Sequence, residues 1–422
     1  MIRTLFLSLL FLIPATAFAQ NTPVEIYSLD RAVKSAMDNS AGIQTAAKDI
    51  EIAEERVLEA RLRFLPDTGF SATATRYNAR RAFALTGAQR STLLFPSDKD
   101  NLFSGQGYVL LSLYEGRRNI NTLRLAQTSL KQARSKFEAV KLDIVYRTKK
   151  AFYQMLLAQQ TIKTVDRVMN AVKNTAQGPS ANTWQRLEAR ALSAQLRALE
   201  AESRHDMELA RLDFLKALNL ELDSDFKIEG ELATEPIGIE LRKALVWATE
   251  LRPELQSQTL RAEMDAIGVN LALSRRNPSV FLGFDYELTG QEFPLRQNNW
   301  DATVGVRLPF AFDFWTQRNQ KIAQQRQAEI KRSELRDFVH LQVRKAHKDL
   351  VYWQQEWRMR ENESSELAAL LEKARGENAR PIDILHAASG VIDAGRRHLN
   401  AVAEHLLARA RLERAVGRTL NP

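Results

Sequence analysis

The chain has 422 residues, no cysteine and a formal net charge of +9. The lack of cysteine excludes disulfide bonds and the cysteine-linked lipid anchor of bacterial lipoproteins. Acidic and basic residues are interleaved along expected helices such as 186–204, which is typical of solvated helix faces, so the charge does not indicate a nucleic-acid partner. The sequence contains no Gly-rich phosphate loop, nucleophile elbow or zinc-protease helix, and we expect no catalytic residue, metal site or cofactor.

The first 19 residues have the features of a cleaved secretory signal peptide. Arg3 precedes an apolar run over residues 5–13, and the small residues Ala17 and Ala19 precede the expected cleavage point before Gln20. We therefore expect an exported protein. No later run reaches the roughly 18 apolar residues of a membrane-spanning helix, so any insertion into a membrane would use strands.

The mature chain contains an internal repeat. Residues 29–66 align with residues 241–278 at a constant shift of 212, and nine of the 38 pairs are identical. Each copy runs from a helical pattern through a proline, Pro66 or Pro278, into an alternating strand pattern. A duplicated supersecondary unit explains this ungapped match.

The first repeat is expected over residues 20–218. After its first helix, strands are expected at about 66–77 and 106–114. A long helix follows at about 117–177, because apolar residues recur every seven positions from Leu123 to Val172, as in a coiled coil. Gly178 and Pro179 end that helix, since proline cannot continue a hydrogen-bonded helix. A return helix is expected at about 181–218.

The second repeat is expected over residues 251–417, after a middle region at 219–250, and a short tail follows at 418–422. It repeats the same plan with one helix, two strands, a long helix and a return helix. The expected bounds are about 279–288 and 301–310 for the strands, 316–375 for the long helix and 382–417 for the return helix.

The expected strands are apolar on one face and polar on the other. From Val280 to Leu288 the even-numbered residues are apolar, whereas Asp285 and Glu287 are acidic. In a soluble protein the apolar face would cover a core. The signal peptide favours a membrane barrel strand instead, with its apolar side toward lipid. Four strands cannot close a barrel, so several copies must contribute, and three copies would supply twelve.

The order of elements and four short motifs resemble the outer membrane efflux protein family, the TolC-type channel-tunnels, over nearly the whole mature chain. Each motif is unspecific alone, and the specificity lies in their order and duplication. The motifs are Leu29-Asp30-Arg31-Ala32-Val33, Arg252-Pro253-Glu254-Leu255, Leu308-Pro309-Phe310 and Asp383-Ile384-Leu385-His386-Ala387.

This resemblance implies a mainly α protein with a small β part. It implies a homotrimer that forms a 12-stranded β-barrel in the outer membrane and a 12-helix tunnel in the periplasm. Such a channel is a passive exit duct of a tripartite efflux pump or type I secretion system. Its partners would be a periplasmic adaptor, or membrane fusion protein, an inner-membrane transporter and outer-membrane lipid. Drug, metal, siderophore and polypeptide cargo all fit a passive duct. The alternative is a soluble periplasmic coiled-coil adaptor or scaffold.

The second helical turn departs from the family pattern in two places. The family commonly has glycine six residues before an acidic position, whereas here Gly376 is seven before Asp383 and Glu377 stands at the glycine position. Where some members carry a second carboxylate, this chain has His386. The first turn, near Trp184, has no acid at the matching place, so the resemblance implies an acidic constriction from one hairpin per subunit.

The pore-gate candidates are Asp383, His386, Glu377 and Arg380. Three copies of Asp383 around an axis would repel one another and bind cations; the alternative is a polar residue early in a helix, where an anion suits the helix dipole. His386 would add a pH response or be a plain surface histidine. The resemblance also assigns the two hairpin tips to adaptor docking, through Gly178, Pro179, Trp184, Gly376 and Pro381.

Arginines cluster around the first inter-strand loop, at Arg76, Arg80, Arg81 and Arg90. Guanidinium groups suit phosphate oxygens, so this cluster would contact outer-membrane lipid phosphates or form an ordinary solvated loop. The seven-residue spacings of His340 with His347, and of His398 with His405, do not indicate a metal site, because no third ligand accompanies either pair.

Overall fold

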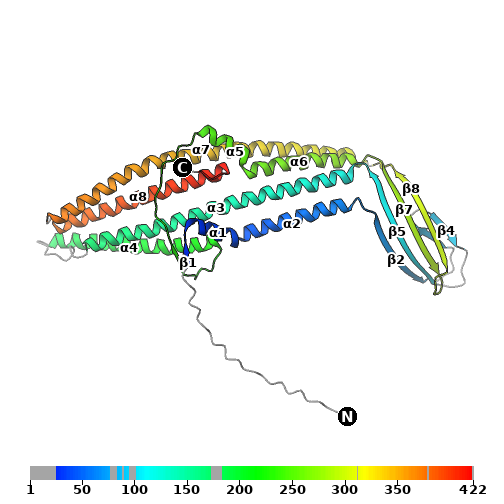
Figure 1. Cartoon of the computed structure of the whole chain (residues 1–422), viewed down its shortest axis with the longest axis horizontal. Helices are drawn as coiled ribbons and strands as arrows, with labels where there is room; N and C mark the ends of the chain where they lie inside the picture. The colour runs from blue at the N-terminus through cyan, green and yellow to red at the C-terminus, as the bar shows by residue number, and fades with distance from the viewer. Residues whose placement is uncertain are drawn as a thin grey trace, which may run out of the picture.

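A computed structural model describes residues 25–76, 83–87, 90–94, 101–172, 183–310, 312–377 and 380–420. The expected signal peptide lies outside these residues. Two pairs of long helices extend to one end of the molecule, and four long strands form the other end (Figure 1). Among the described residues, no helix is both long enough and apolar enough to cross a membrane.

The first half begins with a short strand and two helices. They are β1 (Glu25–Tyr27), α1 (Leu29–Asn39) and α2 (Ala41–Leu62). A single helix was expected here, and the structure breaks it at Ser40. The extended backbone of Ser40 ends α1, and its hydroxyl accepts a hydrogen bond from the Ile43 amide to cap α2.

The rest of the first half consists of four strands and two long helices. They are β2 (Asp67–Arg76), β3 (Phe83–Gly87), β4 (Arg90–Leu94), β5 (Asn101–Glu115), α3 (Arg118–Val172) and α4 (Thr183–Leu218). The hairpin of β3 and β4 was not expected, because the sequence was interpreted there as a loop. The tip between α3 and α4, with Gly178 and Pro179, lies outside the described residues.

The second half repeats this order, with no counterpart of the β3–β4 hairpin among its described residues. Its elements are β6 (Phe226–Ile228), α5 (Leu241–Leu251), α6 (Pro253–Ser274), β7 (Ser279–Gly290), β8 (Gln297–Arg307), α7 (Phe314–Gly376) and α8 (Pro381–Val416). The bounds of α5 and α6 are those of α1 and α2 shifted by 212, and those of α8 are those of α4 shifted by 198. The repeat in the sequence is therefore a repeat of helices with the same bounds.

The long helices lie side by side in one layer (Figure 1). Contacts place α3 against α2 and α4 on one side and against α6 and α8 on the other, and α7 packs on α6 and α8. In this layer α6 and α8 follow one another end to end between α3 and α7, just as α2 and α4 do beside α3. The layer thus has two outer edges, one made of α2 and α4 and the other of α7.

Three hydrophobic clusters hold the helices together. The first-half cluster is rich in aromatic residues and centres on Phe214, with Tyr27 and Phe152. The second-half cluster is aliphatic and includes Val339, Leu350 and Leu412. The tip cluster joins Val165 and Val172 of the expected coiled-coil seam to residues of α4 and α8.

Nearer the strands, the contact between α3 and α6 is polar rather than apolar. The apolar seam residues Leu123 and Leu130 are only half-buried there. The buried residues are Asn121, Thr128 and Ser135, again seven apart. They hydrogen-bond to α6 at Ser274 Oγ (3.3 Å), Glu263 Oε1 (3.4 Å) and the Pro253 carbonyl (2.7 Å), respectively. Because these polar side chains are small, the two helices can approach closely. Their three hydrogen bonds satisfy the polar groups that the contact buries.

The four long strands form one antiparallel sheet in the order β2-β5-β7-β8. β7 ends later than expected, at Gly290, and β8 both starts and ends earlier than expected, at Gln297 and Arg307. Pro309, which lacks an amide hydrogen, follows the end of β8. A second, parallel sheet pairs β1 with β6.

Residues 229–240, here called the strap, cross the helix layer between the two halves (Figure 1). Helix side chains bind the strap. Gln354 accepts a hydrogen bond from the Ile237 amide at 3.0 Å, and His347 Nε2 donates to the Ile239 carbonyl at 2.8 Å. Thr234 Oγ1 lies 2.7 Å from His405 Nδ1. The strap is thereby fixed to both α7 and α8.

Candidate functional site: the sheet and the helical tip

The apolar face of the sheet is exposed. In the register of β7 and β8, Leu282 lies opposite Val304 and Tyr286 lies opposite Trp300, and all four side chains are exposed. Phe70 of β2 lies on the same face, because it pairs with Gly107, which pairs with Tyr286. Exposed apolar patches of this size mark an interaction surface or a lipid-facing surface.

The opposite face carries the polar residues. Glu287 accepts a hydrogen bond from Ser104 at 2.8 Å, and Asp285 accepts one from Gln106 at 3.1 Å. Asp285 lies directly opposite Asp301 in the neighbouring strand. Two like charges in a cross-strand pair are unfavourable unless water or cations reach them. This face is therefore built for an aqueous environment.

Aromatic residues gather at both ends of the apolar face. Trp300 is 66% exposed near one end, and Phe310 and Phe312 are 86% and 99% exposed just beyond the other end. Trp315, in the first turn of α7, lies beside Phe314 and below the guanidinium of Arg276. Exposed aromatic side chains at two levels are the pattern of residues at two membrane–water interfaces.

Within the described residues, the sheet has two unpaired edges. β2 pairs only with β5, and β8 pairs only with β7, so the other long edge of each of these two strands has no partner among the described strands. The helix layer ends at the same two sides, with α2 and α4 on one and α7 on the other. Unpaired strand edges are a template for pairing with another chain.

The described tip of the second hairpin carries all four pore-gate candidates. Gly376 ends α7, Glu377 follows it, and Pro381 starts α8. Asp383 accepts two hydrogen bonds from Arg380, at 2.7 and 3.1 Å, in an exposed bidentate pair. The Asp383 carboxylate raises the pKa of the Arg380 guanidinium through these hydrogen bonds. Two of the four candidates, Asp383 and Arg380, are therefore paired with each other.

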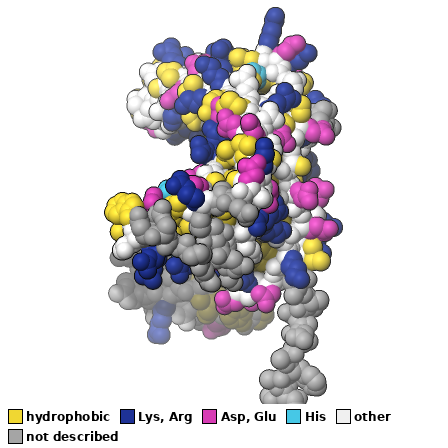
Figure 2. All heavy atoms as spheres, turned by 90° about the vertical axis from the view of Figure 1, so that its left-hand side faces the viewer, with side chains coloured by type: hydrophobic (Ala, Val, Ile, Leu, Met, Phe, Trp, Pro, Cys, Tyr) yellow, Lys and Arg dark blue, Asp and Glu magenta, His cyan; other side chains and the backbone are white. Residues whose placement is uncertain are grey.

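A polar contact joins the two hairpins near the tip. His386 Nε2 lies 3.2 Å from Glu188 Oε1 of α4, so the histidine has a carboxylate partner on the other hairpin. Trp184 is 69% exposed at the start of α4. Figure 2, which views the molecule from this end, shows acidic and basic side chains interleaved on the tip face.

The arginine cluster at the far end is only partly described. Arg76 ends β2 and Arg90 begins β4, whereas Arg80 and Arg81 lie outside the described residues. Arg90 thus belongs to a hairpin and not to an irregular loop.

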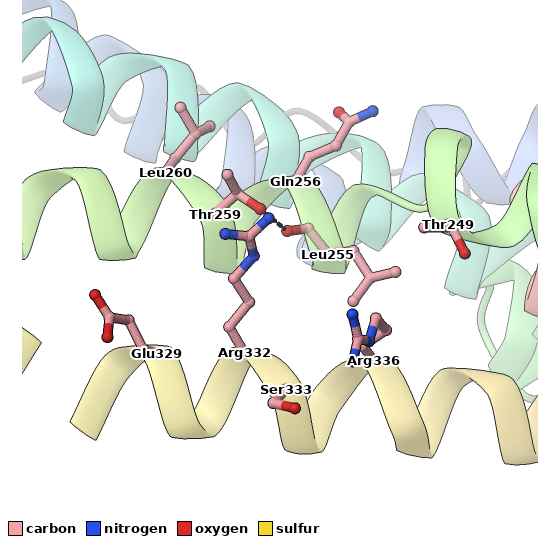
Figure 3. A pocket seen from close by; sticks show the side chains of 9 residues that line it. All are labelled: Thr249, Leu255, Gln256, Thr259, Leu260, Glu329, Arg332, Ser333 and Arg336. Carbon is pink, nitrogen blue, oxygen red and sulfur yellow. Dashed lines mark hydrogen bonds between the residues drawn. The ribbon is translucent and has the colours of Figure 1, made fainter. Parts of the chain in front are cut away.

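A cavity of about 650 Å³ lies between α6 and α7 (Figure 3). Arg332 and Arg336 extend from α7 toward α6, where Thr259 and Leu255 form part of the lining. The Thr259 hydroxyl donates to the Leu255 carbonyl of its own helix at 2.9 Å. Among the described residues, no lining hydroxyl is hydrogen-bonded to the Glu329 carboxylate, and we assign the cavity no chemistry.

Three of the four histidines with a seven-residue spacing have other partners. His340 lies 3.3 Å from the Thr249 hydroxyl, while His347 and His405 bind the strap. Among the described residues, no group of three or more His, Asp or Glu side chains could hold a metal ion.

Comparison with known proteins gives the fold. No family model matches the chain, and no curated protein matches its sequence. Several solved structures match almost its whole length, and three of them are described here. The Campylobacter jejuni CmeC outer membrane channel has a TM-score of 0.77 at 15% identity and covers 92% of this chain and 85% of its own. The Vibrio cholerae outer membrane protein VceC has a TM-score of 0.76 at 16% identity, and the match covers 93% of this chain and 96% of VceC. The Neisseria gonorrhoeae MtrE outer membrane channel has a TM-score of 0.76 at 16% identity, and the match covers 92% of this chain and 89% of MtrE. The resemblance to TolC-type channel-tunnels is therefore confirmed in the fold: the chain folds as these outer-membrane channels do.

Proposed function

We propose that the chain is an outer-membrane channel that assembles as a homotrimer. The observation that carries this proposal is the four-stranded sheet with an exposed apolar face and two unpaired edge strands. Unpaired backbone groups cost several kcal/mol each in hydrocarbon, so such a sheet enters a membrane only when its edges are closed. One chain has too few strands to close a barrel.

Identical copies provide the missing neighbours. The β8 edge of one copy would pair with the β2 edge of the next, and α7 would pack beside α2 and α4 of the next copy. This is a head-to-tail contact, which forms a ring when its rotation closes. Three copies give a 12-stranded barrel with the apolar face toward lipid, while Asp285, Asp301 and Glu287 line the water-filled interior.

The helices would continue this pore into the periplasm as a tunnel. We propose that the channel is the exit duct of a tripartite efflux pump or a type I secretion system. A periplasmic adaptor would dock on the tips near Trp184, Gly376 and Pro381, together with Gly178 and Pro179, and an inner-membrane transporter would supply the energy. Arg76, Arg80, Arg81 and Arg90 would face the phosphates of outer-membrane lipid.

Fractionation tests this proposal against a soluble periplasmic adaptor or scaffold. We expect the protein in the detergent-solubilised outer membrane, with a native mass of three chains. Replacing Val304 and Val306, both exposed on the apolar face, by Glu would prevent insertion, because charges on a lipid-facing strand are costly. Replacing the polar-face residue Thr303 by Glu is the matched control and should insert normally. A soluble wild-type monomer in the periplasm would refute the channel.

The Arg380–Asp383 pair is the proposed gate element. Removing Arg380 leaves three uncompensated carboxylates near the axis, and removing Asp383 leaves three guanidinium groups. In planar-bilayer recordings, Arg380→Ala should raise the preference for cations and Asp383→Ala should lower it. Glu372→Ala, which breaks an exposed pair with Arg375 on the same hairpin, is the control. Unchanged ion preference in both tip variants would remove the pair from the gate.

A further inference from the structure

The second half contains a cavity of about 250 Å³ near the point where α8 ends and α6 begins. Gly417 ends α8 in a left-handed conformation, with φ of 79°. A Cβ at this glycine would lie 3.2 Å from the Leu251 carbonyl oxygen and 3.4 Å from Arg252 Cα, so the two helix ends are in close approach. Residues of α3, α7 and α8 complete the cavity lining around Arg252.

Arg252 is an unusual residue at this junction. It is only 5% exposed, although arginine is rarely buried without full pairing. Its Nε and Nη2 atoms lie 3.2 and 3.5 Å from the Glu254 carboxylate. Its buried Nη1 has no hydrogen-bond partner among the described residues. Because buried donors in folded proteins are almost always satisfied, this nitrogen indicates a missing acceptor.

The cavity lining is strongly basic. Besides Arg252 it includes Lys345, Arg411 and Arg414, against the single carboxylate of Asp349. Arg411 Nη1 lies 3.8 Å from Asp349, and its other ion pair, like that of Arg414, is with a carboxylate outside the lining. The Tyr146 hydroxyphenyl group also lines the cavity. Several guanidinium groups that converge with one free donor are the arrangement that recognises oxyanions.

We propose that this cavity binds a small tetrahedral oxyanion of the phosphate or sulfate type, held by Arg252 Nη1 and by the Lys345, Arg411 and Arg414 side chains. The bound anion would bridge α7, α8 and the start of α6. In the described part of the first half, Ser40 occupies the position that matches Arg252 and uses its hydroxyl as a helix cap, so the buried guanidinium has no counterpart there. This inference does not depend on the channel function.

Calorimetric titration of the full mature chain in detergent tests the site, with inorganic phosphate in chloride buffer at constant ionic strength. We expect saturable binding of one phosphate per chain, with sulfate as a competitor. Arg252 would donate charge-assisted hydrogen bonds to the anion. Because Arg252→Gln loses them, this variant should bind phosphate about tenfold more weakly than the wild type. Lys345→Gln, an exposed position that leaves the core intact, should also weaken binding.

The matched control is Lys348→Gln, an exposed lysine on the same helix that does not line the cavity, and it should bind as the wild type does. If Arg252→Gln does not assemble, the comparison of Lys345→Gln with Lys348→Gln decides alone. If the heat of phosphate binding does not saturate, the cavity holds only water, and this result would overturn the proposal. Equal binding by the wild type and the Lys345→Gln variant would overturn it too, since the anion would then bind elsewhere.

Discussion

The two halves of the molecule build the same helices from different interior chemistry. At the shift of 198 between α4 and α8, Phe214 matches Leu412, Leu215 matches Glu413, and Met207 matches His405. The first half thus places apolar side chains at three positions where the second half has one aliphatic and two ionisable residues. The backbone plan tolerates both solutions because the bounds of a helix depend on its caps and periodicity, whereas the interior depends on which neighbours satisfy each side chain.

The largest expected effect concerns Phe214, which is fully buried among Tyr27, Phe152 and Phe226. Phe214→Ala should lower the stability to unfolding by about 3–5 kcal/mol, because it leaves a large cavity among aromatic rings. Leu412→Ala removes a smaller side chain at the matching place and should cost less. Denaturant unfolding followed by circular dichroism in detergent measures both. A larger loss at Leu412 would show that the aliphatic half carries the stability.

The second prediction concerns the buried carboxylate of Glu413. It is paired with Lys149 and Arg409 and accepts a hydrogen bond from the Leu420 amide at 3.1 Å. Glu413→Leu, which copies the first half, should cost about 3–5 kcal/mol because it leaves Lys149 without its partner. The double change Lys149→Met with Glu413→Leu should restore most of that stability. A double variant as unstable as the single one would show that the ion pair itself is needed.

The third prediction is a pH dependence that arises from His405, whose first-half counterpart Met207 does not titrate. Burial, and then Arg409 and Arg358, lower the pKa of His405 to about 4. At neutral pH His405 is mostly unprotonated in both the folded and the unfolded state. As the pH falls below the ordinary value of about 6.5, the unfolded state gains a proton first, so stability falls by up to about 3 kcal/mol by pH 4. His405→Met, the residue of the first half, should remove this slope.

Unfolding midpoints at pH 7.5, 6 and 4.5 would measure the effect of His405. Because other groups also titrate over this range, the relevant quantity is the difference between the wild type and His405→Met. Parallel curves for wild type and His405→Met would contradict the lowered pKa.

The smallest expected effect lies at the two matched helix starts. Ser40→Ala removes the hydroxyl that caps α2 and should cost about 1 kcal/mol. Arg252 has no side-chain cap bond to α6, where Pro253 at the first position provides the preset backbone angle. Pro253→Ala should therefore cost about as much as Ser40→Ala. A negligible effect at Ser40 would mean that packing alone sets the start of α2.

Some of these features could be read from the sequence and others could not. The shift of 212 and the seven-residue spacing predicted most of the helices and strands, because both report backbone periodicity directly. The breaks at Ser40 and Arg252 were missed, since a cap inside a continuous helical pattern resembles an ordinary polar position. The buried row from Asn121 to Ser135 was missed for a related reason: apolar periodicity does not reveal polar side chains that satisfy one another.

The candidate sites depended on side-chain partners, which spacing predicts less well. The three-residue interval from Arg380 to Asp383 was available in the sequence and would have indicated their ion pair. The contact of His386 with Glu188 joins residues 198 apart, and only the packed hairpins bring them together. The burial of Arg252 also lay beyond the sequence, because arginine is normally assigned to the surface.

The strap makes the long helices behave as levers. Gln354 and His347 fix α7 to the strap at one level, and about 22 residues of α7, or about 33 Å, extend from Gln354 to Gly376. With that level held, these hydrogen bonds oppose sliding of α7 along its axis, and its packing on α8 makes the two helices tilt together. Over about 33 Å, a rotation of about 5° at this level corresponds to a displacement of about 3 Å at Gly376. A small rotation of α7 at the level of the strap thus becomes a larger displacement at the helical tip.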